Sequence, residues 1–252
     1  MQNAVVKEPI SLRRVLPFTM LERTATTPGC RPAGPACNQM CAGLHQHEHA
    51  ACVWRSVRAG QSLYQQGEAL CSIFAVRSGT FKSTLTLVEG STRVCAFPMA
   101  GDVIALDGLG RATYATTMTA LDDAHVCAIA RTSCDQSTGL GTDVQGRLGR
   151  LMCDEMVRAQ KVLVLMGTSR AQDRMGVFLM DISRRYLAQG YSGRDFTLRM
   201  TRSDIGSFLG MALETVSRCL TGMQAQGVIE ITNRRIQITN LETFSKRYGA
   251  WL

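Results

Sequence analysis

The sequence predicts an α+β protein in which an N-terminal antiparallel β-roll, a long helix and a C-terminal winged helix-turn-helix follow one another. Three observations support this prediction. Short β-rich runs recur at a spacing of about ten residues between positions 54 and 130. An unbroken apolar stripe at helical spacing follows them. Near the carboxyl end, a glycine separates two short amphipathic patterns.

The roll is predicted from runs rich in β-branched and aromatic residues that turn residues interrupt. These runs are SLY, SIFAV, GTFKSTLTLV and STRVCAF, and the interrupting glycines are Gly60, Gly67, Gly79, Gly90 and Gly101. We therefore place the roll at 53–145. The preceding segment, 1–52, is rich in proline, glycine and cysteine and shows no sustained period, so we treat it as a separate N-terminal arm.

The long helix is predicted at 146–167, where the chain lacks proline. Apolar residues recur there every three or four positions, at Leu148, Leu151, Met152, Met156, Ala159, Val162, Leu163 and Met166. At 1.5 Å per residue, this helix would be about 30 Å long. A stripe of this length between two dissimilar halves indicates the seam of a homodimer. The alternative is a helix that packs only on its own domain.

The C-terminal domain is predicted at 168–252. Its first helix runs over Ser169–Leu187, with Ser169 as N-cap and Gly190 just beyond its end. The short β-like run FTLRM leads from that helix to the segment TRSDIGSFLGMALETVSRCLTGM.

This segment reads as a helix-turn-helix. Thr201 caps a short helix whose apolar residues are Ile205, Phe208 and Leu209. Gly210 allows the turn, and a second helix follows that buries Val216, Leu220 and Met223 and ends at Gly227. The run VIEITNRRIQI then predicts a β-hairpin wing whose turn holds Asn233, Arg234 and Arg235.

The excess of positive charge lies in the second half of the chain. The whole sequence has 28 Lys+Arg and 20 Asp+Glu. From Gly146 onward there are 16 basic and 9 acidic residues, against 12 and 11 before it. The basic half predicts an anionic partner, nucleic acid first and a membrane surface second. We see neither a secretory signal nor an apolar run of about 18 residues, and we expect a soluble, cytoplasmic protein that does not bind membranes.

The second helix of the motif carries side chains suited to reading base pairs. Arg218 can form a bidentate pair with guanine, Glu214 can accept from cytosine N4, and Ser217 is short enough for close approach. Four further residues are expected to hold the backbone of double-stranded DNA, namely Thr201, Arg202, Arg234 and Arg235. We see no acid/base pair in the sequence that would indicate an enzyme, and we expect that the protein is not one.

The run MTRSDIGSFLGMALETVSRCL resembles the DNA-binding signature of the CRP/FNR family of bacterial transcription regulators. GQSLYQQGEALCSIFAVRSGTFKS and FPMAGDVIALDGLG resemble that family's cyclic-nucleotide-binding-like sensor domain. The E-x-x-S-R pattern resembles the FNR branch. This likeness implies a homodimer that reads a palindrome of the type TTGAT-N4-ATCAA, with RNA polymerase as a protein partner.

Four of the ten cysteines crowd into the arm, as Cys30, Cys37, Cys41 and Cys52. In a reducing compartment, such a group indicates metal or redox chemistry. The resemblance implies a [4Fe–4S] cluster with three N-terminal ligands and a fourth in the roll, where Cys127 in HVCAIA matches. Cys37, Cys41 and either Cys30 or Cys52 are the N-terminal candidates, although their spacing departs from the family's C-x2-C-x5-C. Sensing of thiol oxidation, nitric oxide or haem remains the alternative.

Two further expectations concern small ligands. Thr116 and Thr117 stand where the cyclic-nucleotide branch carries a phosphate-binding arginine, so we expect no binding of cAMP. His45, His47 and His49 alternate in the arm. They could bind zinc or haem on a strand, and they would be solvated polar residues on a helix or loop.

Overall fold

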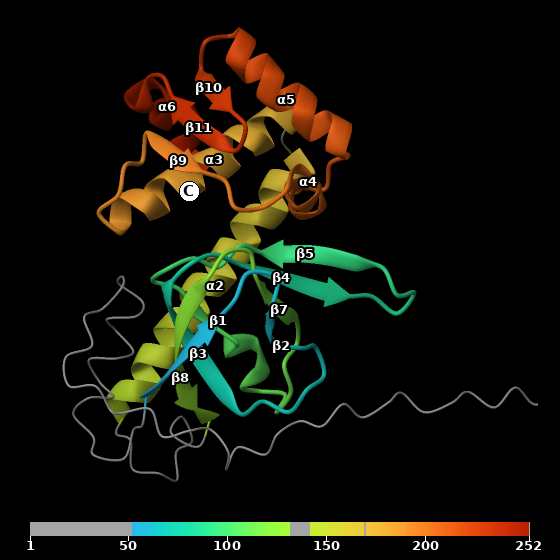
Figure 1. The fold of residues 1–252 in the computed structure, drawn as a ribbon, viewed down its shortest axis with the longest axis vertical. Coiled ribbons are helices and arrows are strands. Elements are labelled where there is room, and N and C mark those ends of the chain that lie inside the picture. The colour runs from blue at the N-terminus through green and yellow to red at the C-terminus, as the bar shows by residue number, and fades with distance from the viewer. Residues whose placement is uncertain (1–51, 132–141, 169, 252) are drawn as a thin grey trace, which may run out of the picture.

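The computed structural model describes residues 52–131, 142–168 and 170–251. The arm predicted at 1–52 lies outside these residues, apart from the backbone of Cys52, and so do its remaining cysteines and its three histidines. A roll at the N-terminal side and a helical domain at the C-terminal side are connected by the long helix α2 (Thr142–Thr168) (Figure 1). The predicted order of domains is therefore confirmed.

The roll consists of two four-stranded antiparallel sheets among the described residues, in the orders β1-β8-β3-β6 and β2-β7-β4-β5. Gly79 begins the turn into β4 with φ of +87°. A Cβ atom on it would lie 2.5 Å from that of Ala124, so only glycine fits. The strands are β1 (Cys52–Val57), β2 (Ser62–Tyr64), β3 (Ser72–Ser78), β4 (Phe81–Thr86), β5 (Thr92–Ala96), β6 (Val103–Ile104), β7 (Thr117–Ala120) and β8 (Ala124–Ala130), with the 3-10 turn η2 (Leu106–Gly108).

Helix α2 is longer than the predicted 146–167, because it already begins at Thr142. Its apolar stripe divides between two faces. Leu148 and Leu151 are buried in the core of the roll. Met152, Met156 and Leu163 remain 45%, 57% and 68% exposed. Packing on its own domain thus accounts for one face of the helix and leaves the other uncovered in the single chain.

The C-terminal domain packs α3 (Ala171–Ala188) against the helix pair α4 (Arg202–Leu209) and α5 (Leu213–Ala225), and the wing (β10 Ile229–Thr232, β11 Arg235–Ile238) continues into β9 (Asp195–Thr197). The expectation that Ser169 caps α3 is wrong, because Arg170 occupies the N-cap position and its side chain makes no capping bond. Helix α6 (Leu241–Tyr248), which Asn240 caps, and the turn η5 (Gly249–Trp251) were not predicted.

Helix α6 packs on α3 at a glycine. A Cβ atom added to Gly176 would lie 2.4 Å from Cε1 of the buried Tyr248 ring. Gly176→Ala is therefore expected to destabilise the protein by about 1–3 kcal/mol, because the ring cannot move without disturbing the core. Urea denaturation measures this change. Gly222→Ala in α5, where a Cβ meets open space, is the matched control and should stabilise by up to about 1 kcal/mol. Equal effects of the two substitutions would contradict the packing described.

Candidate nucleic-acid interface

The first helix of the pair, α4, begins with a complete capping box. The Thr201 hydroxyl accepts from the Asp204 backbone N–H at 3.1 Å and donates to Asp204 Oδ2 at 2.6 Å. The Thr201 backbone N–H donates to the same oxygen at 3.1 Å. Gly210 ends the helix in the left-handed region with φ of +61°. The predicted cap and glycine turn are both confirmed, and they fix the start and end of α4.

The second helix, α5, is oriented by its apolar face. Val216, Leu220 and Met223 are almost completely buried, as predicted. Glu214 and Arg218 are exposed four residues apart, on the side of α5 away from the core. Ser217 lies beside Arg218 and is partly buried. The structure therefore brings together the Glu214 carboxylate, the Ser217 hydroxyl and the Arg218 guanidinium, which the sequence predicts to contact bases.

Arg202 has a role that sequence reasoning missed. Its Nη1 atom donates a hydrogen bond to Ser217 Oγ at 3.2 Å, so α4 and α5 are joined at the face of α5 that carries Glu214, Ser217 and Arg218. Fifteen positions separate the two residues, and only the angle between the helices brings them together. Thr201, likewise expected to hold the DNA backbone, uses its hydroxyl within the capping box.

The wing has a two-residue turn, Asn233–Arg234, in which Asn233 has φ of +58°. The expectation that Arg235 lies in this turn is wrong, because Arg235 pairs with Thr232 as the first residue of β11. Its Nε donates to Asp195 Oδ1 at 2.7 Å, and this hydrogen bond lowers the pKa of the Asp195 carboxyl. Arg234 donates to the carbonyl oxygen of Arg199 at 3.3 Å. Arg234 is thus the arginine at the tip of the wing.

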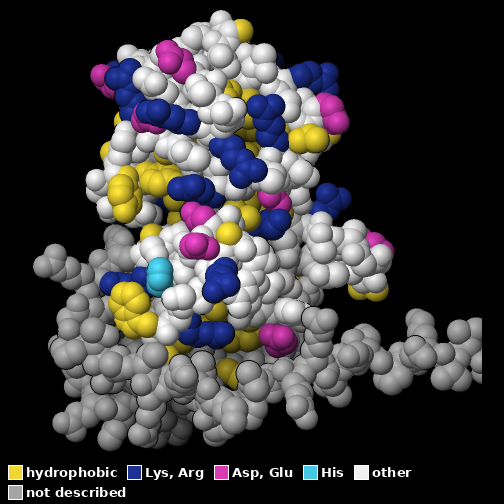
Figure 2. Space-filling view, viewed as in Figure 1, with side chains coloured by type: hydrophobic (Ala, Val, Ile, Leu, Met, Phe, Trp, Pro, Cys, Tyr) yellow, Lys and Arg dark blue, Asp and Glu magenta, His cyan; other side chains and the backbone are white. Residues whose placement is uncertain are grey.

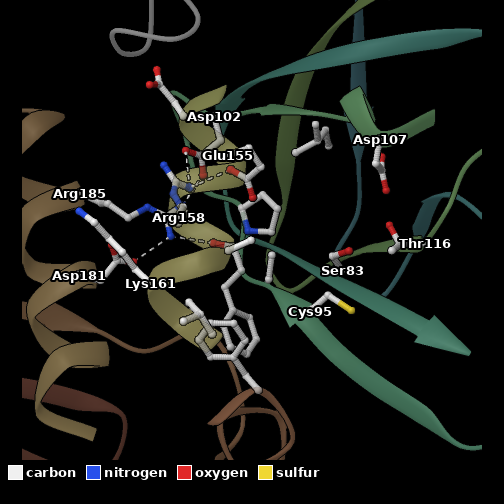
Figure 3. Close-up of a pocket in the computed structure, with 18 of the residues that line it drawn as sticks. Ser83, Cys95, Asp102, Asp107, Thr116, Glu155, Arg158, Lys161, Asp181 and Arg185 are labelled. Carbon is white, nitrogen blue, oxygen red and sulfur yellow. Dashed lines mark hydrogen bonds and ion pairs between the residues drawn. The ribbon is translucent and has the colours of Figure 1, made fainter. Parts of the chain in front are cut away.

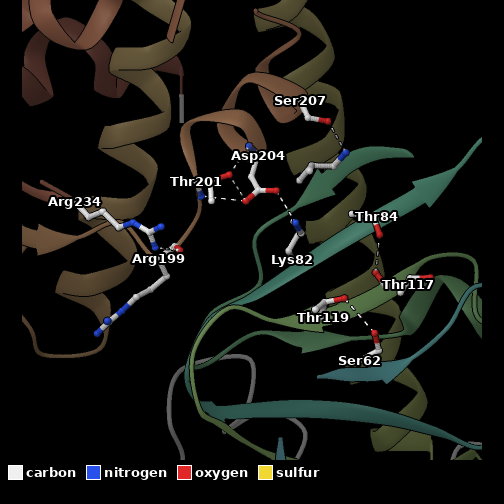
Figure 4. Close-up of polar contacts among 11 residues, drawn as sticks. Ser62, Lys82, Thr84, Thr117, Thr119, Arg199, Thr201, Asp204, Ser207 and Arg234 are labelled. Carbon is white, nitrogen blue, oxygen red and sulfur yellow. Dashed lines mark hydrogen bonds and ion pairs between the residues drawn. The ribbon is translucent and has the colours of Figure 1, made fainter. Parts of the chain in front are cut away.

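The roll binds directly to α4 (Figure 4). Lys82 Nζ of β4 lies 2.6 Å from Oδ1 of Asp204, the same carboxylate that closes the capping box. One strand further, the Val94 N–H donates to Ser207 Oγ at 3.0 Å. The two partners of the ion pair are 122 residues apart, so no local pattern could have predicted it. The roll therefore fixes the position of α4, the helix that packs against α5.

Two further contacts connect the halves at the sides of this pair. Arg199 Nε lies 3.2 Å from Asp122 Oδ2, which belongs to the turn before β8. The rings of Phe97 and Phe208 meet edge to face, with centroids 5.3 Å apart. Charged and apolar contacts together define one orientation of the helix-turn-helix on the roll.

The pair of Lys82 and Asp204 gives a pH-dependent prediction. Burial raises the pKa of Asp204, yet the hydrogen bonds from Lys82 and Thr201 outweigh it and hold the pKa below the ordinary 3.8. Lys82→Met is expected to cost about 1–2 kcal/mol at neutral pH, because it leaves a largely buried carboxylate without its cation. This difference should be constant above pH 3.8 and shrink as Asp204 becomes protonated below it.

Urea denaturation of both proteins across the acid range measures this difference. Lys246→Met is the matched control, because Lys246 forms a pair of 2.7 Å with Glu242 in which both side chains are more than three-quarters exposed. It should change stability by less than about 0.5 kcal/mol. A Lys82→Met effect that persists unchanged below the pKa of Asp204 would exclude the ion pair as its source.

A cavity of about 710 Å³ lies between the roll, α2 and α3. Figure 3 shows Ser83, Cys95, Asp107 and Thr116 on its roll side, and Arg158, Lys161 and Arg185 on the helical side. Among the described residues of the roll, no lysine or arginine lines it. Arg185 is already paired with Asp102 and Asp181. The roll side thus offers the hydroxyls of Ser83 and Thr116 and the carboxylates of Asp102 and Asp107. The Thr117 hydroxyl instead accepts a hydrogen bond from the Gln66 backbone N–H at 3.0 Å.

Basic side chains are spread over the C-terminal domain on the face shown in Figure 2, with a few acidic ones between them. This distribution agrees with the charge asymmetry of the sequence and suits contact with a phosphate backbone. Among the described helices, none combines the length and apolar character needed to cross a bilayer.

Comparison with known proteins gives matches to both halves of the chain. Residues 173–247 match the model of a Crp-like helix-turn-helix domain, and residues 54–136 match that of a cyclic nucleotide-binding domain. The fumarate and nitrate reduction regulatory protein of Escherichia coli is 32% identical over 195 residues, which are 77% of this chain and 78% of that protein. The transcriptional regulatory protein btr of Bordetella pertussis is 33% identical over 193 residues, covering 77% and 80%. The solved structure of FixK2 from Bradyrhizobium japonicum has a TM-score of 0.69 at 27% identity and covers 78% of this chain and 97% of its own.

Proposed function

Because the chain belongs to the CRP/FNR family of DNA-binding transcription regulators, we propose that it acts as a homodimer that reads an FNR-like palindrome, TTGAT-N4-ATCAA, under the control of oxygen or redox state. The observation that supports base recognition is the face of α5 that carries Glu214, Ser217 and Arg218, which lies away from the buried side of the helix. Arg218 would take the guanine and Glu214 would accept from cytosine on the other strand. RNA polymerase is proposed as the protein partner, on the family likeness.

The proposed dimer interface is the uncovered face of α2. Met152, Met156, Ala159 and Leu163 follow one another at intervals of four, three and four residues, the spacing of a two-helix seam. All four are exposed in the single chain. A stripe of this kind exceeds the scattered apolar residues of an ordinary surface and suits a second copy of the same helix.

The seam has no charge at its centre, since Ala159 stands there. A like charge at that place would repel its copy when desolvated and would make dimerisation depend on the sensor. We therefore expect air-exposed apoprotein to remain a dimer at micromolar concentration. Analytical ultracentrifugation measures this, and a monomer would contradict the expectation.

The proposed sensor is a [4Fe–4S] cluster held by thiolates of Cys37, Cys41, Cys127 and either Cys30 or Cys52. When bound, such a cluster supplies oxygen-sensitive redox chemistry. Cys127 is suited to be a cluster ligand. It is completely buried, and it lies on β8 on the face opposite Val126 and Ala128. The described residues contain no group of three or more metal-binding side chains, so the other ligands would have to come from the arm.

A thiol switch is the second candidate, and one observation favours it. Cys127 takes part in a disulfide bond in the structure. The thiols described as free, Cys71, Cys95, Cys153 and Cys219, are not its partners. In this candidate, oxidation of two thiols to a disulfide, with release of two electrons and two protons to an oxidant such as peroxide, would take the place of cluster loss.

Iron and sulfide analysis of anaerobically purified protein distinguishes the cluster from the thiol switch. The cluster predicts four iron and four sulfide per chain, with a broad visible absorbance that bleaches in air. Replacement of Cys127, Cys37 or Cys41 by serine should remove the iron and the sulfide, and so should replacement of one of Cys30 and Cys52. Cys95→Ser, which changes a free thiol of the roll, should remove neither. Protein without iron that gains a disulfide in air would support the thiol switch, and a sharp Soret band would indicate haem.

A further inference from the structure

The contact between α4 and α5 at the reading face has a consequence for base recognition. The Arg202 guanidinium donates to Ser217 Oγ across 3.2 Å. Arg202 is exposed and Ser217 partly so, and the contact therefore lies at the surface that would meet DNA. A guanidinium has donors and no acceptor, so Ser217 can only be the acceptor in this bond.

This bond restricts what the serine hydroxyl can do next. A hydroxyl has one proton and two lone pairs. With one lone pair directed at Arg202, the proton and the second lone pair take the two remaining positions around Oγ, so the bond holds the hydroxyl in one orientation in place of free rotation. We propose that Arg202 is a positioning residue that fixes the orientation of the Ser217 hydroxyl toward the DNA and thereby sets the base that Ser217 prefers. This inference rests on the proposed reading of DNA by α5.

The consequence for specificity follows from the edges of the bases in the major groove. Thymine O4, guanine O6 and the N7 atoms of both purines accept a hydrogen bond, whereas cytosine presents the N4 amino group, which donates. A hydroxyl held in one orientation presents either its proton or its remaining lone pair to the base it faces, and it therefore discriminates between cytosine and the bases that accept. A serine free to rotate could present either one and would lose that discrimination.

The surroundings of Arg202 leave its side chain available for this role. Asp204 is the acid closest to it in sequence, and both of its carboxylate oxygens are occupied, one by Lys82 and the other by Thr201. The capping box also fixes the first turn of α4, where Arg202 is the first residue. Ordering of this turn reduces the side-chain entropy that the contact with Ser217 must overcome.

The competing role for Arg202 is the one that the sequence suggested, a contact to a DNA phosphate. The two roles differ in what they change. Loss of a phosphate contact weakens binding to every duplex by a similar factor and lowers the slope of log affinity against log salt by about one. Loss of a positioning contact changes the preference at a single base pair and leaves the preferences elsewhere intact.

The test compares binding of anaerobically purified protein to the palindrome and to every duplex with one symmetric base change in its half-sites. Ser217→Ala identifies the base that Ser217 reads. Arg202→Met is then expected to reduce the discrimination between hydrogen-bond-accepting and hydrogen-bond-donating bases at that same position by about tenfold and to preserve the other preferences. The double variant should match Ser217→Ala at this position, because Arg202 acts there only through the serine. Arg234→Gln, at the tip of the wing, is the control for a uniform loss.

Three results would overturn the inference. Arg202→Met could weaken all duplexes by one factor, as a phosphate contact does. It could also change the preference at a base other than the one that Ser217→Ala identifies. Finally, Ser217→Ala could leave every preference unchanged. Failure of the proposed function is separate, since unmodified protein would then not distinguish the palindrome from a scrambled duplex.

Discussion

Leu163→Glu is expected to abolish dimerisation and, with it, tight binding to the palindrome. Leu163 is 68% exposed in the single chain, so the substitution should leave the folded monomer intact. In the proposed dimer, the two glutamates would face each other across a dry seam without a cation. An uncompensated buried charge costs about 3–5 kcal/mol, which raises the dissociation constant of the dimer by at least about a hundredfold.

Sedimentation velocity and DNA titration at the same protein concentration measure both consequences. Lys161→Glu is the matched control, because Lys161 lies two positions away, about 200° around the helix from the seam. It introduces the same side chain and should leave the dimer intact. A Leu163→Glu protein that sediments as a dimer would place the interface elsewhere on the molecule.

Arg218→Ala is expected to remove most of the preference for the guanine of each half-site. The side chain is exposed on α5 and can reach guanine O6 and N7 with two parallel hydrogen bonds. Each half-site should lose about 1–3 kcal/mol, and a dimer reads two of them. Affinity for the palindrome therefore falls much further than affinity for a scrambled duplex.

Competition titrations with the palindrome and its guanine-substituted forms measure this loss. Arg247→Ala serves as the control. Arg247 lies over the ring of Tyr248 on α6, so this substitution removes an equal charge from another part of the domain. Arg218→Lys should recover charge but little specificity, since an ammonium lacks the planar fork. An Arg218→Ala protein that retains the full guanine preference would be incompatible with its assigned role.

The fold was largely predictable because periodicity and turn chemistry are local properties. The strands of the roll, the capping box at Thr201 and the glycine turn at Gly210 each follow from residues within a few positions. The misplaced start of α3 and the missed helix α6 also have local causes. Arg170 caps without a side-chain bond, and α6 is only eight residues long, too short to show a decisive period.

The candidate site was predictable only where one element carries it. Glu214, Ser217 and Arg218 share α5, so their spacing alone placed them together. The contacts that join elements could not be found in this way. Lys82 meets Asp204, Arg202 meets Ser217 and Arg235 meets Asp195 through tertiary packing, which pairs residues without any fixed sequence separation. For Arg235, the expected contact with the DNA backbone stays a prediction.

Replacement of the half-site guanine by 7-deazaguanine tests most directly whether the guanidinium on α5 reads a base edge. This change removes a single acceptor atom, N7, and leaves base pairing and the phosphate backbone unaltered. Unmodified, anaerobically purified protein should bind the altered palindrome at least about tenfold more weakly, because Arg218 loses one of its two charge-assisted hydrogen bonds at each half-site. Equal affinity for the two duplexes would contradict the assignment.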